Sequence, residues 1–140
     1  MSDLAELLER VRAATGPDRS IDVAIAIAFP PEGEKRRELS DASTRCGQYW
    51  YSHKYEEGSR SALEFTASID AALALTERML PGWSWKIVGE PGAVYPHCAV
   101  VRNAATLSDV AEAFVASHRT PSLAILSALL AALIAQEPQP

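Results

Sequence analysis

Apolar residues recur with helical spacing near the start of the chain and again in its middle. Residues 2–15 carry Leu and Val at positions i, i+3, i+4 and i+7, so they predict an amphipathic helix that a Gly-Pro pair ends and that Ser2 can cap. Residues 66–80 carry a second apolar stripe and end at a Pro-Gly pair. We expect a helix there as well, with Thr66 or Ser68 as its N-cap.

A further helix is predicted at the end of the chain, with Thr120 as N-cap and Pro121 in the first turn, where its missing N–H costs nothing. Its apolar face is so wide that the helix needs burial on two sides. One side can be a sheet, and the other can be the N-terminal helix or a second copy of the protein. A homo-oligomer formed through the C-terminal helix is therefore one expectation. Residues 137–140 are expected to fray.

Two segments fit either a helix or a strand. In residues 18–28, helical spacing competes with an alternation of Val, Ile and Phe with alanines. Alanine favours helices and is poor in strands, and Asp18 is a good N-cap, so we predict a helix there. Residues 107–117 also fit a helix, whereas Ala111 to Val115 can instead pair as a third strand, and the pattern leaves both open.

Strict alternation predicts a strand over residues 83–88, with both tryptophans on one face. A Glu-Pro-Gly turn follows, and residues 93–102 are expected to form the return strand. Pro96 cannot donate a ladder hydrogen bond, so this strand is expected at a sheet edge or bulged at that point. Together these elements predict one α+β domain over residues 1–136, with helices packed on a small antiparallel sheet.

The long stretch between the helices predicted at 18–28 and 66–80 lacks strong periodicity. Connections of this length are uncommon in compact domains and are usually functional or mobile. We therefore expect residues 30–65 to be irregular, with room for a short helix near residues 34–41. The stretch is rich in aromatic and basic residues.

Four aromatic residues, a histidine and a lysine stand together in Tyr49-Trp50-Tyr51-Ser52-His53-Lys54-Tyr55. Tyr and Trp dominate the binding energy of protein interfaces, so one interpretation is a recognition loop. The other is a β-strand whose aromatic residues pack on the core. In that strand, one face would carry Tyr49, Tyr51, His53 and Tyr55, and the other Trp50 and Lys54. The candidate partner-binding residues are Lys35, Arg36, Arg37, Tyr49, Trp50, Tyr51, His53, Lys54 and Tyr55.

Charge and composition limit the partners and the cellular location that we expect for this protein. The net charge of -5 argues against a general nucleic-acid binder, which needs a basic face, so no direct nucleic-acid partner is expected. Two cysteines do not make a disulfide framework, and both are expected as reduced thiols. The N-terminus shows no signal peptide, and the most apolar stretch, residues 123–135, is too short to span a bilayer. We therefore expect a cytoplasmic protein without a membrane partner.

Three stretches share a recognisable pattern: DLAELLERVRAATGPDRSIDVAIAIA, FTASIDAALALTERMLPGWSW and RTPSLAILSALLAAL. The pattern is a first helix with a Gly-Pro-Asp break, an aromatic-Thr-Ala-Ser-Ile-Asp-Ala-Ala-Leu helix, a Trp-containing strand and a last helix started by Thr-Pro. It resembles uncharacterised phage and prophage accessory proteins with a phage ABA sandwich domain. The resemblance implies an α-β-α arrangement of helices about a small antiparallel sheet. It implies no catalytic or binding residues.

No catalytic, cofactor or metal motif stands out. The chain has no GxSxG, no P-loop and no GxGxxG. The adjacent His97 and Cys98 would point to opposite faces of a strand and not reach one ion. We expect no metal, no cofactor and no catalytic residues. An enzyme that handles a small molecule or nucleotide stays an alternative. Its polar groups would be His53, Lys54, Arg36 and Arg37.

The resemblance implies an accessory protein of a phage or prophage. The absence of catalytic motifs and the aromatic-rich stretch favour a non-enzymatic one, which acts by binding a host or phage protein. A specific hypothesis is counter-defence, in which the acidic domain is an anti-CRISPR-like inhibitor that occupies a basic surface of a host nucleic-acid-handling complex. The small size, the acidic total and the aromatic-rich stretch motivate it. The alternative is a structural or assembly role in the phage particle as a homo-oligomer.

Overall fold

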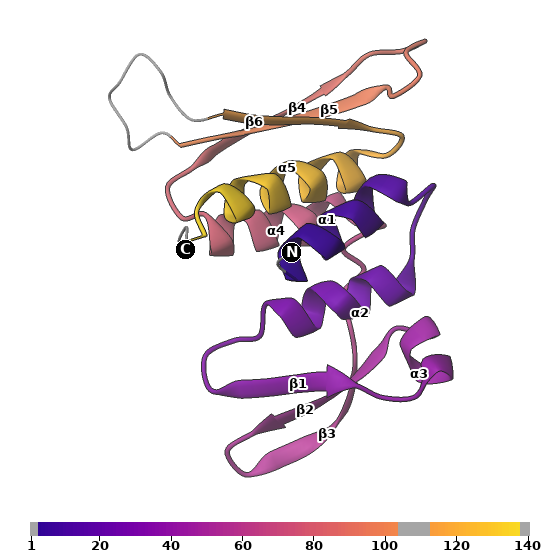
Figure 1. Ribbon diagram of the computed structural model, residues 1–140, viewed down its shortest axis with the longest axis vertical. Helices are drawn as coiled ribbons and strands as arrows, with labels where there is room; N and C mark the ends of the chain where they lie inside the picture. The colour runs from indigo at the N-terminus through magenta and orange to yellow at the C-terminus, as the bar shows by residue number, and fades with distance from the viewer. Residues whose placement is uncertain (1–2, 104–112, 138–140) are drawn as a thin grey trace.

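The structure, a computed structural model, describes residues 3–103 and 113–137. The described residues form five helices and two antiparallel sheets of three strands each (Figure 1). The helices are α1 (Asp3–Ala13), α2 (Arg19–Ala28), α3 (Asp41–Arg45), α4 (Ile69–Met79) and α5 (Pro121–Ala135). The strands are β1 (Glu34–Glu38), β2 (Gln48–His53) and β3 (Glu56–Ser61) in one sheet and β4 (Ser84–Gly89), β5 (His97–Arg102) and β6 (Ala113–His118) in the other.

Helices α1, α2, α4 and α5 lie between the two sheets, and α3 lies beside the β1–β3 sheet (Figure 1). The β4–β6 sheet packs on α5, which also contacts α1 and α4, while α2 lies between α1 and the β1–β3 sheet. The prediction of an α+β domain with helices packed on a small antiparallel sheet is confirmed. The order of the layers differs from the arrangement that the resemblance implied, because the chain forms two sheets and holds α1, α2, α4 and α5 between them.

α5 forms the centre of the hydrophobic core. Its residues from Ser122 to Leu130 are buried, and α1, α4, β5 and β6 pack around it. Thr120 caps its N-terminus, as predicted, by accepting the backbone N–H of Leu123. The chain's own elements therefore cover the wide apolar face that suggested a second copy of the protein, so this face no longer supports a homo-oligomer.

No helix in the described part of the chain is long and apolar enough to cross a membrane.

α2 is the helix predicted from its alanine-rich pattern, and Asp18 caps it. In its first turn, the buried carboxylate of Asp22 accepts the backbone N–H and the hydroxyl of Thr66, each at 2.8 Å. Arg19 donates to the other carboxylate oxygen of Asp22 at 2.8 Å. Thr66 therefore bonds the first turn of α2, and the N-cap of α4 is Ser68. These bonds attach α2 to the connection between β3 and α4.

β5 is the central strand of its sheet and pairs with both neighbours. The prediction that Pro96 places this strand at an edge or bulge is wrong, because Pro96 precedes the first paired residue, His97. β6 shows that the end of the ambiguous segment 107–117 is a strand. The rest of that segment, the predicted cap Ser2 and residues 138–140 of the predicted frayed tail lie outside the described residues.

Residues 30–65, predicted to be irregular, contain the whole β1–β3 sheet and α3. The short helix predicted near residues 34–41 is wrong, because Glu34–Glu38 is a strand and α3 follows it. Charged side chains occupy the inner positions of β1 and β3, where apolar residues would normally mark the period of a strand. Only β2 shows that period, with Tyr49 and Tyr51 buried.

Candidate binding site on the β1–β3 sheet

The β1–β3 sheet gathers the residues that the sequence put forward, and its register sorts them onto two faces. Because successive side chains of a strand point to opposite sides, paired residues share a face. The inner face, toward α2, carries Glu34, Arg36, Glu38, Tyr49, Tyr51, His53, Glu56, Gly58 and Arg60. The outer face carries Lys35, Arg37, Gln48, Trp50, Ser52, Glu57, Ser59 and Ser61.

A buried carboxylate organises the inner face. The side chain of Glu34 is 6% exposed and pairs with Arg36 through one oxygen and with Arg60, at 3.0 Å, through the other. Arg36 also donates to the carbonyl of Ala26 in α2 at 2.8 Å. These contacts hold both guanidinium groups in place on the inner face.

Two tyrosines of β2 support these arginines from beneath. The guanidinium carbon of Arg36 lies 4.9 Å from the ring centroid of Tyr49, and that of Arg60 lies 3.8 Å from the ring centroid of Tyr51. The hydroxyl of Tyr51 donates to Glu56 at 3.0 Å. Both tyrosines are buried. They therefore stabilise the charged layer and are not surface contacts for a partner.

The same contacts shift two pKa values. Burial acts to raise the pKa of Glu34, but hydrogen bonds from Arg36 and Arg60 and their positive charges outweigh it, so this pKa is lowered from its ordinary value of 4.5. A hydrogen bond to Tyr49 is the main cause that raises the pKa of Arg60, against burial and with the help of Glu34. Glu34 and Arg60 are consequently both charged throughout the neutral range.

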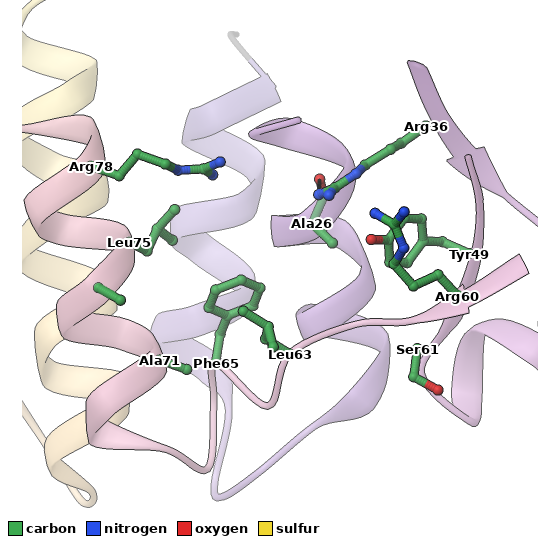
Figure 2. Close-up of a pocket in the computed structure, with 11 residues that line it drawn as sticks. Ala26, Arg36, Tyr49, Arg60, Ser61, Leu63, Phe65, Ala71, Leu75 and Arg78 are labelled. Atoms are coloured by element: carbon green, nitrogen blue, oxygen red, sulfur yellow. Dashed lines mark hydrogen bonds between the residues drawn. The ribbon is translucent and has the colours of Figure 1, made fainter. Parts of the chain in front are cut away.

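A pocket of about 390 Å³ lies between this sheet and α4 (Figure 2). Arg78, in the last turn of α4, reaches toward it from the side opposite Arg36 and donates to the carbonyl of Phe29 at 2.7 Å. The polar lining residues are Arg36, Arg60, Arg78, Tyr49 and Ser61. The apolar lining residues are Ala26, Leu63, Phe65, Ala71, Ala74 and Leu75.

The pocket has groups that bind anions but lacks the pairing of a nucleophile with a base. Its lining residues include no His, Cys, Asp or Glu. Neither Tyr49 nor Ser61 has a base among the lining residues that could activate its hydroxyl group. The geometry therefore favours binding over catalysis.

The outer face of the sheet presents one aromatic residue among polar ones. The guanidinium carbon of Arg37 lies 4.4 Å from the ring centroid of Trp50. Trp50 is half-buried, whereas Lys35, Arg37 and Ser59 around it are exposed. At the end of the β2–β3 hairpin, the side chain of Tyr55 is fully exposed. This face is therefore a basic surface with a single aromatic anchor.

The candidate partner-binding residues divide into three groups. The outer face has Lys35, Arg37 and Trp50, the inner face has Arg36, Tyr49, Tyr51 and His53, and the turn has Lys54 and Tyr55. The interpretation of this stretch as a strand packed on the core is confirmed for Tyr49 and Tyr51, which are buried. It is wrong for Lys54 and Tyr55, because the strand ends at His53 and these two residues turn the chain.

The structure does not gather the polar residues put forward for an enzyme. Of that set, Arg36 alone lines the pocket. Arg37 points to the opposite face of the sheet, and Lys54 lies in the turn. His53 stands on the inner face, paired in register with Glu34. Chemistry that needs these side chains around one substrate has no support in this arrangement.

Sequence reasoning missed two arginines of the pocket. Arg60 belongs to the strand EEGSRS, which has no apolar residue to reveal it as a strand. Arg78 lies in the last turn of α4, where a basic residue is ordinary, and its partner Phe29 is 49 residues away in the chain. Neither residue carries a local signal, so only the fold brings them together.

Histidines and cysteines do not assemble a metal centre in the part of the chain that the structure describes. Cys46 and Cys98 are free thiols. The buried His118 is used in packing: its Nδ1 accepts the backbone N–H of Arg119, so its Nε2 donates to the carbonyl of Val11 at 3.1 Å. The ring of His118 thereby joins β6 to α1.

Comparison with known proteins gives no match, whether to protein-family models, to curated proteins or to solved structures. The function of the chain therefore has to be inferred from its own geometry and sequence.

Proposed function

We propose that this chain is a non-enzymatic binding protein, and that the outer face of its β1–β3 sheet docks on an acidic surface of a partner protein. The observation that carries the proposal is Trp50, which lies half-buried under Arg37 among polar side chains. Trp and Arg contribute most of the binding energy at protein interfaces, and a polar rim excludes water around them. The inner face of the sheet packs on α2, so a partner meets the outer face.

The charges of the outer face favour an acidic partner. Lys35 and Arg37 stand on it beside one carboxylate, that of Glu57, although the chain as a whole has a net charge of -5. An acidic partner attracts this basic face and repels the acidic rest of the protein. The two proteins therefore meet with the basic face turned toward the partner. Lys54 and the exposed Tyr55 extend the surface at the end of the hairpin.

The resemblance to phage accessory proteins supports a phage or prophage setting, in which the partner is a host or phage protein in the host cytoplasm. In the narrower form of the proposal, the partner belongs to a host nucleic-acid-handling complex, such as a CRISPR effector, and binding inhibits it. The outer face then meets an acidic surface of that complex and not the basic one expected from the net charge alone. The net charge of -5 supports this form, because an acidic domain seated on such a complex repels nucleic acid.

The test compares two double variants that are immobilised and exposed to nuclease-treated host lysate. Trp50→Ala with Arg37→Ala removes the docking pair, and Trp85→Ala with Lys86→Ala removes an exposed tryptophan and an exposed lysine from β4. We expect the first variant to reduce retention of the partner by at least about tenfold and the second to leave it unchanged. Added salt should weaken retention by the wild type.

Equal retention by the two variants would contradict the proposal, because the docking pair would then contribute nothing. A bound component of untreated lysate that disappears on nuclease treatment would also contradict it, since the outer face would then bind nucleic acid and not protein.

A further inference from the structure

We propose that the pocket between the β1–β3 sheet and α4 binds a small organic anion, that is, a carboxylate or phosphate group on an apolar body. Three guanidinium groups, those of Arg36, Arg60 and Arg78, line this pocket together with apolar side chains (Figure 2). The pocket lies on the side of the sheet opposite the proposed docking face. The inference therefore goes beyond partner binding and does not depend on it.

The lining of the pocket is positively charged because two of its three arginines share one acid and the third donates to a carbonyl. Glu34 pairs with Arg36 and Arg60, whereas Arg78 bonds only a carbonyl, and no lining residue is acidic. Three positive charges against one negative charge leave the cluster with an excess of two. An anion that enters neutralises this excess through charge-assisted hydrogen bonds, which are about twice as strong as neutral ones.

The arginines are held in place and still have donors to offer. A guanidinium group has five N–H donors. Arg36 uses its Nε for Glu34 and its Nη1 for the carbonyl of Ala26. Arg78 uses its Nη2 for the carbonyl of Phe29. Since these contacts fix the side chains before a ligand arrives, binding costs little additional conformational entropy.

The rest of the wall fits a hydrocarbon body. Leu63 and Phe65 come from the connection between β3 and α4, and Leu75 comes from α4 itself (Figure 2). The volume of about 390 Å³ is near the lower end of the range for ligand pockets, which suits a molecule with one ring or a short chain. An inorganic ion would leave the apolar wall uncovered.

A purely structural role is the competing explanation for two of the arginines. Arg36 and Arg78 both donate to carbonyls at the C-terminal end of α2, where positive charge stabilises a helix. That role predicts a loss of stability when either arginine is replaced. Only a binding site predicts, in addition, that anionic probes bind and that filling the pocket abolishes their binding.

Isothermal titration calorimetry on the full chain tests the proposal with two anionic probes, phenyl phosphate and hexanoate, and their uncharged counterparts, phenol and hexanamide. We expect each anion to bind at least about tenfold more tightly than its counterpart. The ratio of the two anion affinities identifies the preferred head group. High salt should weaken both anions and leave the uncharged probes unaffected.

Three variants separate binding from folding. Arg78→Gln removes one guanidinium group and should weaken both anions by about tenfold or more. Ala74→Phe fills the pocket from an exposed position of α4, so it should abolish binding with every arginine still present. Arg45→Gln is the control, because Arg45 is an exposed arginine of α3 that does not line the pocket, and it should leave both affinities unchanged. Thermal unfolding of each variant verifies its fold.

Equal binding of each anion and its uncharged counterpart would overturn the proposal, and so would the absence of measurable binding by all the probes. Wild-type affinity in the folded Ala74→Phe variant would overturn it as well, even if Arg78→Gln fails to fold. Loss of partner docking, by contrast, is measured on Trp50 and Arg37, so failure of this proposal and failure of the proposed function are told apart.

Discussion

Replacing Asp22 by asparagine tests the attachment that positions the pocket. Asp22 is 1% exposed, and its carboxylate joins the first turn of α2 to the connection between β3 and α4. That connection supplies two pocket residues, Leu63 and Phe65. Asp22→Asn keeps the size of the side chain and removes its negative charge, so it isolates the electrostatic part of the attachment.

The expected loss follows from the three hydrogen bonds that Asp22 accepts, two from Thr66 and one from Arg19, each at 2.8 Å. Asparagine keeps one oxygen for Thr66 but turns an amide N–H group toward the Arg19 guanidinium. A hydrogen bond to a charged group contributes about 1.5–3 kcal/mol. We therefore expect Asp22→Asn to lower the free energy of unfolding by about 3 kcal/mol and Asp22→Ala by about 4 kcal/mol.

Urea denaturation followed by circular dichroism measures these free energies by linear extrapolation. Asp70→Asn is the matched control, because Asp70 also lies in the first turn of a helix but is exposed. Its interaction with the helix dipole is worth about 0.5 kcal/mol. If Asp22→Asn cost no more than Asp70→Asn, the buried attachment would be refuted and Asp22 would act through the helix dipole alone.

Three further substitutions test other parts of the β1–β3 sheet. The pKa of Glu34 is lowered in the folded protein, so Glu34 stabilises the fold fully above its ordinary pKa of 4.5 and loses this effect at lower pH. The difference in unfolding free energy between wild type and Glu34→Gln, measured by urea titration, should therefore shrink below that pH. Gly47→Ala should lower the melting temperature and cost about 2 kcal/mol, because Gly47 has a φ of 86° and a methyl group there would collide with Arg19. Lys54→Gly should raise the melting temperature and stabilise by about 0.5 kcal/mol, because Lys54 has a φ of 49°; a decrease would show that its side chain makes a stabilising contact.

The helices and the second sheet could largely be predicted because their apolar residues carry the period of the element. In α5, the Thr120-Pro121 start and the run of leucines identified both the boundary and the burial of the helix. In α2, the alanines and the Asp18 cap correctly predicted a helix and not a strand. Pro96 misled the reasoning about β5, because a proline just before a ladder leaves no hydrogen bond missing.

The β1–β3 sheet and its pocket could not be predicted because their inner positions are charged. β1 reads EKRRE and β3 reads EEGSRS, so neither shows an apolar alternation. Their inner residues are stabilised by ion pairs around Glu34 and by tyrosine rings beneath Arg36 and Arg60. These contacts join residues of different strands, so they form only when the strands are already aligned. The third arginine, Arg78, arrives from a helix that the sequence does not connect with the sheet.

Photocrosslinking from the outer face tests most directly the central claim that the β1–β3 sheet binds the partner protein. A photoreactive amino acid is placed either at Ser59, which pairs with Trp50 in the register, or at Ser84, an exposed serine of β4, and host cells that produce each chain are irradiated. We predict a crosslink to a protein with an acidic surface from Ser59 and none from Ser84. Equal crosslinking from the two positions, or none from Ser59, would contradict the claim.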